Sequence, residues 1–286
     1  MISVFITILT YILSSIFAIA GMGAAGVLIP NYIAFGLGVN IAMILGLSQN
    51  TAELTVTTIM NARKQLIDWK KAVMVLIPAV ILVPIGAYIN IHIPKILVLV
   101  VFALFLLFAL YKILLPSKNK GGIRSTSLTM LFGALEGFIG GLIGMDAAPI
   151  AIIAFSYIFD NPKKISANTA TVALGVSATT LITYRLMLPT MLINMWTLLA
   201  VTTAGLLGSI TGVLLMHKIK QIYIRYTMIG ILTLAFVEIF IKIFSQGHLI
   251  PNDLYYGSVI SVVIGLIVFV TLAMVRFVSF KKLENK

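Results

Sequence analysis

The stretch GGLIGMDAAP, residues 140–149, interrupts a long apolar run with three glycines, an aspartate and a proline. A straight helix over 127–158 would extend about 50 Å at 1.5 Å per residue, whereas the hydrocarbon core of a bilayer is about 30 Å thick. Backbone that leaves a helix at membrane depth is tolerated only where it is buried in protein or lines a wet cavity. We therefore predict that 127–158 is a broken helix that turns inside the membrane.

The composition of the whole chain is typical of a membrane protein. Of its 286 residues, 60% are hydrophobic and 10% are charged, and the mean hydropathy is +1.13. Apolar segments follow one another at 2–36, 41–62, 72–91, 96–115, 127–158, 164–184, 195–216, 222–244 and 254–278. Each is long enough to cross a bilayer as a helix, so we predict an all-α, polytopic integral membrane protein. The first residues have no basic region or cleavage site, so we expect no cleaved signal peptide.

The residue types exclude several kinds of site. The chain has no cysteine, so disulfides and thiol chemistry are absent. The three histidines lie at segment ends without metal-ligand spacing, and neither a Walker loop nor a Ser/His/Asp arrangement occurs. We therefore expect no metal, no cofactor and no enzymatic activity. The net charge of +12 is expected in cytoplasmic loops rather than on a surface that binds nucleic acid.

A second glycine cluster indicates an internal duplication. GMGAAG at 21–26 matches GMDAAP at 144–149 with an offset of 123, and SQNTA at 48–52 matches SANTA at 166–170 with an offset of 118. The first copy is therefore expected to have five more residues between the two motifs. The predicted organisation is a first repeat half (1–115), a basic cytoplasmic connector (116–126), a second repeat half (127–245) and an additional C-terminal transmembrane helix with a basic tail (246–286).

The loop charges predict how the two long segments, 2–36 and 127–158, cross the membrane. If each crossed once, the 20 lysine and arginine residues would divide evenly between the two sides. If 127–158 enters and leaves by one face, only Lys95, Arg185 and Lys242 lie opposite the other 17, as the positive-inside rule requires. Each half then contains a re-entrant hairpin plus three transmembrane helices, which makes the halves inverted repeats. We expect a multi-pass protein of the cell membrane with basic loops and C-terminus in the cytoplasm.

Two hairpin turns that approach each other from opposite faces predict the functional site. Inverted-repeat transporters bind substrate near the midplane, where broken helices meet, and the free N–H groups of a helix N-terminus attract anions. The predicted substrate contacts in the turns are Gly21, Met22, Gly23, Ala24, Gly144, Met145, Asp146 and Ala147. Hydrogen bonds to the anion are predicted from Asn50, Thr51, Asn168 and Thr169. The alternative for these four is that they join helices to each other.

Three carboxyl groups inside apolar segments are candidates for proton coupling, since intramembrane carboxyl groups usually face a cavity and mark function. They belong to Glu53, Glu136 and Asp146. A structural alternative stands beside each: Asp146 caps the helix that follows it, Glu53 pairs with a cation, and Glu136 lies near the membrane interface. An ionised Asp146 would repel a bound anion, so we expect it to be protonated during transport or turned away from the substrate.

Several of these stretches resemble the sulfite exporter TauE/SafE family of membrane transporters. The resemblance covers most of residues 10–245 and rests on AGMGAAGVLIP (20–30), SQNTAELTV (48–56), ARKQLIDWKKA (62–72), GGLIGMDAAPIAI (140–152) and SANTATVALGV (166–176). It implies a protein of two related halves that moves a small anion, often sulfite or an organosulfonate. The chain departs from the family at Asp146, where a small residue is usual, and its second-half motif is poorer in glycine.

The leading hypothesis for function is a secondary transporter, an exporter, of a small sulfur-containing anion that works by alternating access between the two halves. Proton coupling through the three carboxyl groups is part of this hypothesis. Two alternatives stay open: an intramembrane enzyme or structural subunit that uses the same polar hairpin site, and a passive anion channel. The expected partners are a small anion and the lipid bilayer but no nucleic acid, and a homo-oligomer is left open.

Overall fold

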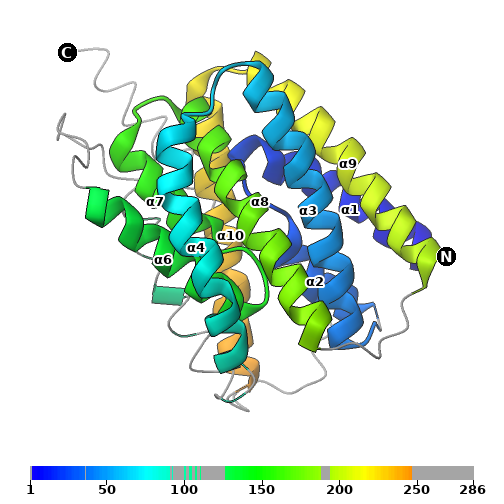
Figure 1. Cartoon of the computed structure of the whole chain (residues 1–286). Coiled ribbons are helices and arrows are strands. Elements are labelled where there is room, and N and C mark those ends of the chain that lie inside the picture. Colours follow the sequence, from blue (N-terminus) through cyan, green and yellow to red (C-terminus); the bar gives the residue numbers. More distant parts are fainter. Residues whose placement is uncertain are drawn as a thin grey trace.

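The described part of the chain is a bundle of helices (Figure 1). The structure is a computed structural model that describes residues 2–35, 37–90, 92, 100, 103–104, 107, 110, 126–187 and 194–246. The elements are α1 (Ile2–Ala20), α2 (Ala25–Ala34), α3 (Val39–Arg63), α4 (Trp69–Asn90), α6 (Thr126–Ile143), α7 (Ala148–Ile158), α8 (Pro162–Met187), α9 (Met195–Lys218) and α10 (Gln221–Gln246). The all-α prediction is confirmed for these residues, and the predicted C-terminal helix at 254–278 lies outside them.

Four of the described helices are long and apolar enough to cross a membrane, namely α4, α6, α8 and α9. Their outward faces carry large apolar side chains, such as Ile77, Ile81 and Ile85 on α4, which are about half exposed. A row of this kind is what a lipid-facing helix surface requires. The prediction of an integral membrane protein is therefore supported by the lengths and the surfaces of the helices.

Both long segments are broken where the glycine clusters lie. The helix α1 ends at Ala20 and α2 begins at Ala25, while α6 ends at Ile143 and α7 begins at Ala148. Gly21 and Gly144, the first residues after α1 and α6, have φ of +72° and +77°, a left-handed conformation that favours glycine. In both turns the next N–H, of Met22 or Met145, donates to the carbonyl five residues back, at 3.2 and 3.1 Å. The two turns thus share one type of glycine C-cap.

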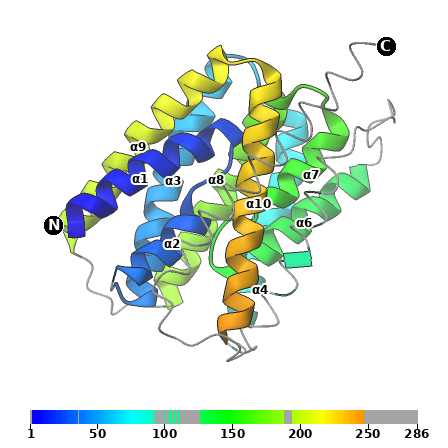
Figure 2. The ribbon, with the colours of Figure 1, turned by 180° about the vertical axis from the view of Figure 1, so that it is seen from behind.

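Close helix packing fixes the direction of each hairpin. Glycines of α6 lie directly on successive carbonyls of α4, in the pairs Gly133–Val75, Gly137–Ala79 and Gly141–Val83. Glycines of α9 lie on carbonyls of α1, in the pairs Gly208–Tyr11 and Gly212–Ser15. Because the numbers rise together in both sets, α6 runs parallel to α4 and α1 runs parallel to α9. The side-by-side course of α1 and α9 is visible from both sides of the bundle (Figures 1 and 2).

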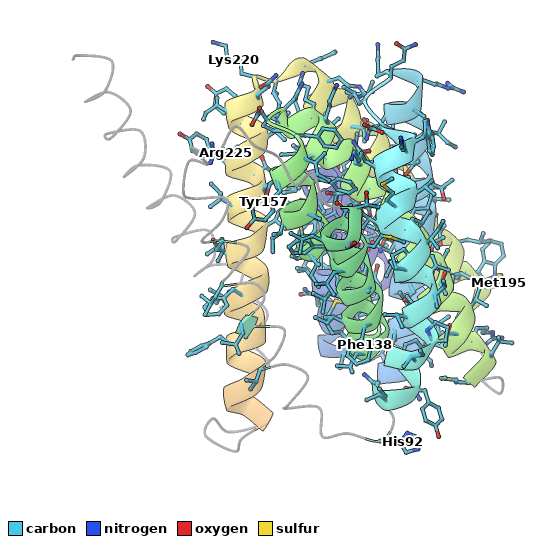
Figure 3. All side chains as sticks on the ribbon, turned by 60° about the vertical axis from the view of Figure 1, so that its left-hand side comes forward. His92, Phe138, Tyr157, Met195, Lys220 and Arg225 are labelled. Atoms are coloured by element: carbon cyan, nitrogen blue, oxygen red, sulfur yellow. The ribbon has the colours of Figure 1, made fainter. Side chains whose placement is uncertain are left out.

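The loops of the bundle gather positive charge at one end. We call this the basic end; it contains Arg63, Lys64, Lys70, Lys71, Lys163, Lys164, Lys218 and Lys220. Figure 3 shows Lys220 at this end and His92 at the other, which we call the opposite end. The helix α9 starts at the opposite end and ends at the basic end with Lys218. Since α1 runs parallel to α9, the α1–α2 hairpin also starts at the opposite end, and α2 returns to that end, where α3 begins. Since α6 runs with α4, the α6–α7 hairpin starts at the basic end and returns there to α8.

One prediction about the duplication is wrong. The two glycine turns are 123 residues apart. Adding 123 to the bounds of α3, residues 39–63, gives 162–186, which agrees with the bounds of α8 to within one residue. The linkers 35–38 and 159–161 differ by one residue in length, so the expected five-residue difference is absent. Asn50 and Asn168 are therefore not equivalent positions: they lie in similar sequence motifs, but at different distances from the starts of α3 and α8. The packing of the turns fixes the register instead: Gly21 contacts Ser166, and Gly144 contacts Met43, again 123 residues apart.

Candidate functional site

The two hairpin turns meet in the middle of the bundle, and Asn50 of α3 joins them. Its Oδ1 accepts a hydrogen bond from the N–H of Ala25, the first residue of α2, at 3.2 Å. Its Nδ2 donates to Oδ2 of Asp146 in the second turn, at 2.5 Å, and to Oγ of Ser177 in α8, at 3.1 Å. Beside this bridge, Sδ of Met145 lies 3.1 Å from the position that a Cβ on Gly26 would take. We call this place the hairpin junction.

Glycine at position 23 is required by the same contact. The amide of Asn50 occupies the space that a Cβ on Gly23 would fill, so any larger residue would displace it. Among the hydrogen bonds of the described residues, none engages the N–H of Gly23 or of Gly26. The N-terminus of α2 therefore presents free N–H groups beside Asn50, at the positive end of a helix dipole.

Asp146 is buried in the second turn, one residue before Ala147, the N-cap of α7. Its Oδ1 accepts from the N–H of Ala148 at 3.3 Å, while Oδ2 accepts from Asn50. The side chain is 7% exposed. The hydrogen bond from Ala148 that the capping alternative predicted is present, although the N-cap residue is Ala147, and the carboxylate is turned toward protein donors.

A chain of hydroxyl groups continues from Asn50 along α3 and α8. Ser177 accepts from Asn50, and its Oγ lies 3.2 Å from Oγ1 of Thr51. Thr51 donates to the carbonyl of Leu47 at 2.8 Å, so the hydrogen between the two hydroxyl groups belongs to Ser177. Thr51 is half-buried, and it is the member of this chain nearest to the surface.

Glu53 lies one helical turn above Gln49 on α3 and faces the first hairpin turn. Its Oε2 accepts a hydrogen bond from Nε2 of Gln49 at 2.5 Å, and the same Nε2 donates to Oγ of Ser14 in α1 at 2.7 Å. The carboxyl group also interacts with the backbone N–H of Ala24. Its side chain is fully buried, and no cation contacts it, so the described residues do not provide the ion pair that the structural alternative required.

Glu136 is the most isolated of the three carboxyl groups. It is fully buried in α6, and neither of its carboxyl oxygens has a hydrogen-bond partner. Four residues on, Gly140 lies against Val176 and against the backbone of the second turn. Glu136 therefore occupies the face of α6 that looks toward the hairpin junction and Asp146. An ionised carboxylate without a partner is costly at such a place.

The remaining predicted residues of the turns are buried around the junction. Gly21 packs on the backbone of Ser166, whose Oγ donates to the carbonyl of Ile19 at 3.0 Å. Met22 and Ala147 are at most 4% exposed and belong to the apolar core. These residues hold the turns in place and leave the polar contacts to Asn50 and Asp146.

Asn168 and Thr169 are not brought to the junction. Oδ1 of Asn168 accepts from the N–H of Asp68 at 3.0 Å, and its Nδ2 donates to the carbonyls of Leu66 and Lys164. Asn168 therefore holds the α3–α4 loop at the basic end. Thr169, its neighbour, is buried with its hydroxyl group unpaired. The four polar residues predicted as one set thus divide, with Asn50 and Thr51 at the junction and Asn168 and Thr169 away from it.

Sequence reasoning missed three residues of this network: Gln49, which donates to Glu53, Ser14, which accepts from Gln49, and Ser177, which accepts from Asn50. Serine in a membrane helix is common and carries no local signal of its role. With the offset of 123, Ser177 corresponds in the repeat to Leu54 of α3, the residue next to Glu53, which would have drawn attention to this position. Metal chemistry has no support within the described residues, where no group of three His, Cys, Asp or Glu side chains could hold an ion.

Comparison with known proteins identifies a family. The family model described as sulfite exporter TauE/SafE matches residues 6–239, which span both hairpins and every described helix except the ends of α1 and α10. A search of curated proteins and a search of solved structures found no match. The family match includes Asn50, Glu53 and both glycine turns.

Proposed function

Because the chain belongs to the sulfite exporter TauE/SafE family of membrane transporters, we propose that it exports a small anion, sulfite or an organosulfonate, and binds it at the hairpin junction. The observation that carries this proposal is the position of Asn50, which touches the start of α2 and the second turn together. An anion at this place would meet the free N–H groups of Gly23 and Gly26. Helix N-termini with free N–H groups are common anion sites.

We propose further that the two halves are inverted repeats whose hairpins are re-entrant from opposite faces of the membrane. Three observations support this arrangement. The hairpins start and return at opposite ends of the bundle, their turns share one glycine cap, and the bounds of α1–α3 shifted by 123 nearly reproduce those of α6–α8. Repeats of this kind allow one half to rock against the other around a fixed central site, which is alternating access.

Proton coupling is the second part of the proposed mechanism. Glu53, Glu136 and Asp146 surround the junction from α3, α6 and the second turn, and all are buried. A buried carboxyl group is easier to accommodate when it is protonated, because the neutral form avoids the cost of desolvating a charge. Protonation of these groups would reduce the repulsion of an incoming anion, and anion release would favour loss of the proton. Anion and proton would therefore move together through the same site.

The proposal is tested by the flux of labelled sulfite in proteoliposomes, with and without a pH gradient. Wild-type protein is expected to show saturable flux that the gradient accelerates. The variant Asn50→Ala removes the bridge between the turns and should lower this flux by about 5- to 150-fold, as the loss of buried hydrogen bonds worth about 1–3 kcal/mol predicts.

The matched control is Asn31→Ala, which removes a buried asparagine of the α1–α2 hairpin; among the described residues, its Nδ2 donates to the carbonyl of Val27 in its own helix. It should retain most of the flux. Equal loss in both variants would contradict a special role for Asn50. Flux that does not saturate would indicate a channel, and absence of flux in wild-type protein would overturn the transporter proposal for these anions.

A further inference from the structure

A row of buried polar side chains runs along α3 from the hairpin junction to the basic end. It contains Gln49, Glu53, Thr57 and Asn61, each four residues from the next and each fully buried. Four-residue spacing places side chains above one another on a single helix face. Between Glu53 and Asn61 the row covers about 12 Å of helix at 1.5 Å per residue. We call these four residues the polar row.

Every member of the polar row keeps a polar atom that has no partner. These atoms are Oε1 of Gln49, Oε1 of Glu53, Oγ1 of Thr57 and Nδ2 of Asn61. Buried polar groups in folded proteins nearly always have hydrogen-bond partners, supplied either by protein or by ordered water. The four unpaired groups follow one another on one helix face and include both acceptors and a donor. Such groups can hydrogen-bond a line of water molecules.

The helix that covers this face is α9. Gln49 lies against Gly205, and Oδ1 of Asn61 lies 3.0 Å from Nε2 of His217. Both pairs differ by 156 in residue number, so α3 and α9 run parallel in constant register along the whole row. The same register places Ser209, which is also fully buried, at the level of Glu53. The small residues Gly205 and Ser209 of α9 therefore lie opposite Gln49 and Glu53, the two members of the row nearest to the hairpin junction.

The row ends at a histidine that reaches the basic end. His217 is half-buried, and the Nζ of Lys163 donates to its backbone carbonyl at 2.7 Å. The charged groups that act on its ring are Lys64, from the α3–α4 loop, and Lys163, from α8. Toward the junction end of the row, the titratable groups that act on Glu53 include Asp146 of the second turn and Tyr32 of α2. The row thus joins a buried carboxyl group to a ring that titrates near neutral pH in solution.

We propose that the polar row is a water-filled proton path between Glu53 and the basic end, with His217 at its mouth. A proton from solvent at the basic end moves along the hydrogen-bonded waters and converts the Glu53 carboxylate to the neutral acid. Each proton that Glu53 gains in this way is one that the solvent at the basic end loses. Movement in the reverse direction returns the proton and restores the carboxylate. The path meets the anion site at Glu53 and carries only the proton, while the anion is bound between the two turns. The inference rests on the proposed proton-coupled transport.

The experiment uses Thr57→Val, which replaces a hydroxyl group by a methyl group of similar size and makes the middle of the row apolar. The matched control is Thr58→Val, because Thr58 is also buried in α3 with an unpaired hydroxyl group but lies off the row. Two assays are made in proteoliposomes: exchange of labelled sulfite for unlabelled sulfite at equal pH, and sulfite-dependent movement of protons reported by a dye.

Thr57→Val should keep exchange and lose proton movement about a hundredfold or more, the lower end of what a positioned proton-transfer group contributes. Thr58→Val should resemble wild type in both assays, and Thr57→Ser should restore proton movement. Equal proton movement in Thr57→Val and wild type, or loss of exchange and proton movement together, would overturn the proton path. If Thr57→Val does not fold, His217→Gln takes its place with the same expectations. Absence of sulfite exchange in wild-type protein would instead refute the proposed function.

Discussion

Asn50 is the residue on which the junction depends, because its one amide serves three elements. It accepts from α2, donates to the second turn and donates to α8. Each buried hydrogen bond of this kind contributes about 1 kcal/mol, but removing one partner leaves the other groups unpaired at greater cost. A side chain that holds two turns together can also release them, so rearrangement of its hydrogen bonds is a simple way to separate the turns during transport.

Asp146 places a carboxyl group at the proposed anion site, so we expect its replacement to strengthen anion binding. Asp146→Asn keeps an acceptor for the N–H of Ala148 and removes the negative charge. We expect binding of methanesulfonate, whose own charge is constant, to tighten at least about tenfold at alkaline pH, as expected for a unit charge a few ångströms away. The gain should shrink at acidic pH, since a protonated Asp146 no longer repels the anion.

Isothermal titration calorimetry of the purified protein measures this effect. The same substitution at Asp160, an exposed residue of the α7–α8 linker, serves as the control and should leave the affinity unchanged. Weaker binding in Asp146→Asn at every pH would show that the carboxylate organises the site and does not repel the anion.

At the scale of the elements, the glycine face of α6 determines how the second hairpin sits against α4. Gly137 lies on the carbonyl of Ala79, with no room for a side chain. We expect Gly137→Leu to force the helices apart and to lower the free energy of unfolding by about 1–3 kcal/mol or more, the usual cost of overpacking. The midpoint of thermal unfolding in detergent reports the change.

The control is Gly38→Leu, because nothing lies within 4 Å of a Cβ at that position and its φ is −58°. Its unfolding midpoint should stay close to that of wild type. A Gly137→Leu variant as stable as the Gly38 variant would mean that α4 and α6 do not approach as closely as described.

The breaks in the two long apolar segments could be predicted from sequence, whereas the correspondence between the positions of α3 and α8, the helices that follow the hairpins, could not. A glycine cluster inside an apolar run favours a turn, and both turns lie at such a cluster, the second with aspartate and proline beside it. The correspondence of Asn50 with Asn168 failed because it rested on similar letters, while the register of α8 is set by its contacts with the turns.

Burial was the other quantity that the sequence could not supply. The four-residue spacing of Gln49, Glu53, Thr57 and Asn61 is visible in the sequence, but a polar face of this kind is equally typical of a solvated helix. Only the packing of α9 over α3 shows that the face is buried. Ser177 was missed for a related reason, since its role arises from the meeting of α8 with Asn50.

At the scale of the whole molecule, the two hairpins bring their turns together in the middle of the bundle. Each hairpin starts and ends at one end of the bundle, the two use opposite ends, and their turns meet at Asn50. The positive charge collects at the end where the second hairpin starts, which agrees with the loop charges that predicted its course. If that end faces the cytoplasm, the anion site is reached from the two sides of the membrane past different hairpins.

The central claim is that an anion binds where the two turns meet, and a crystal structure with selenite tests it most directly. Selenite has the shape and charge of sulfite, and selenium gives an anomalous signal that water and lipid do not. The account predicts an anomalous peak at the hairpin junction, about 3 Å from the amide of Asn50 and from the N–H groups of Gly23 and Gly26. Selenite bound elsewhere in the molecule, with none at the junction, would contradict it.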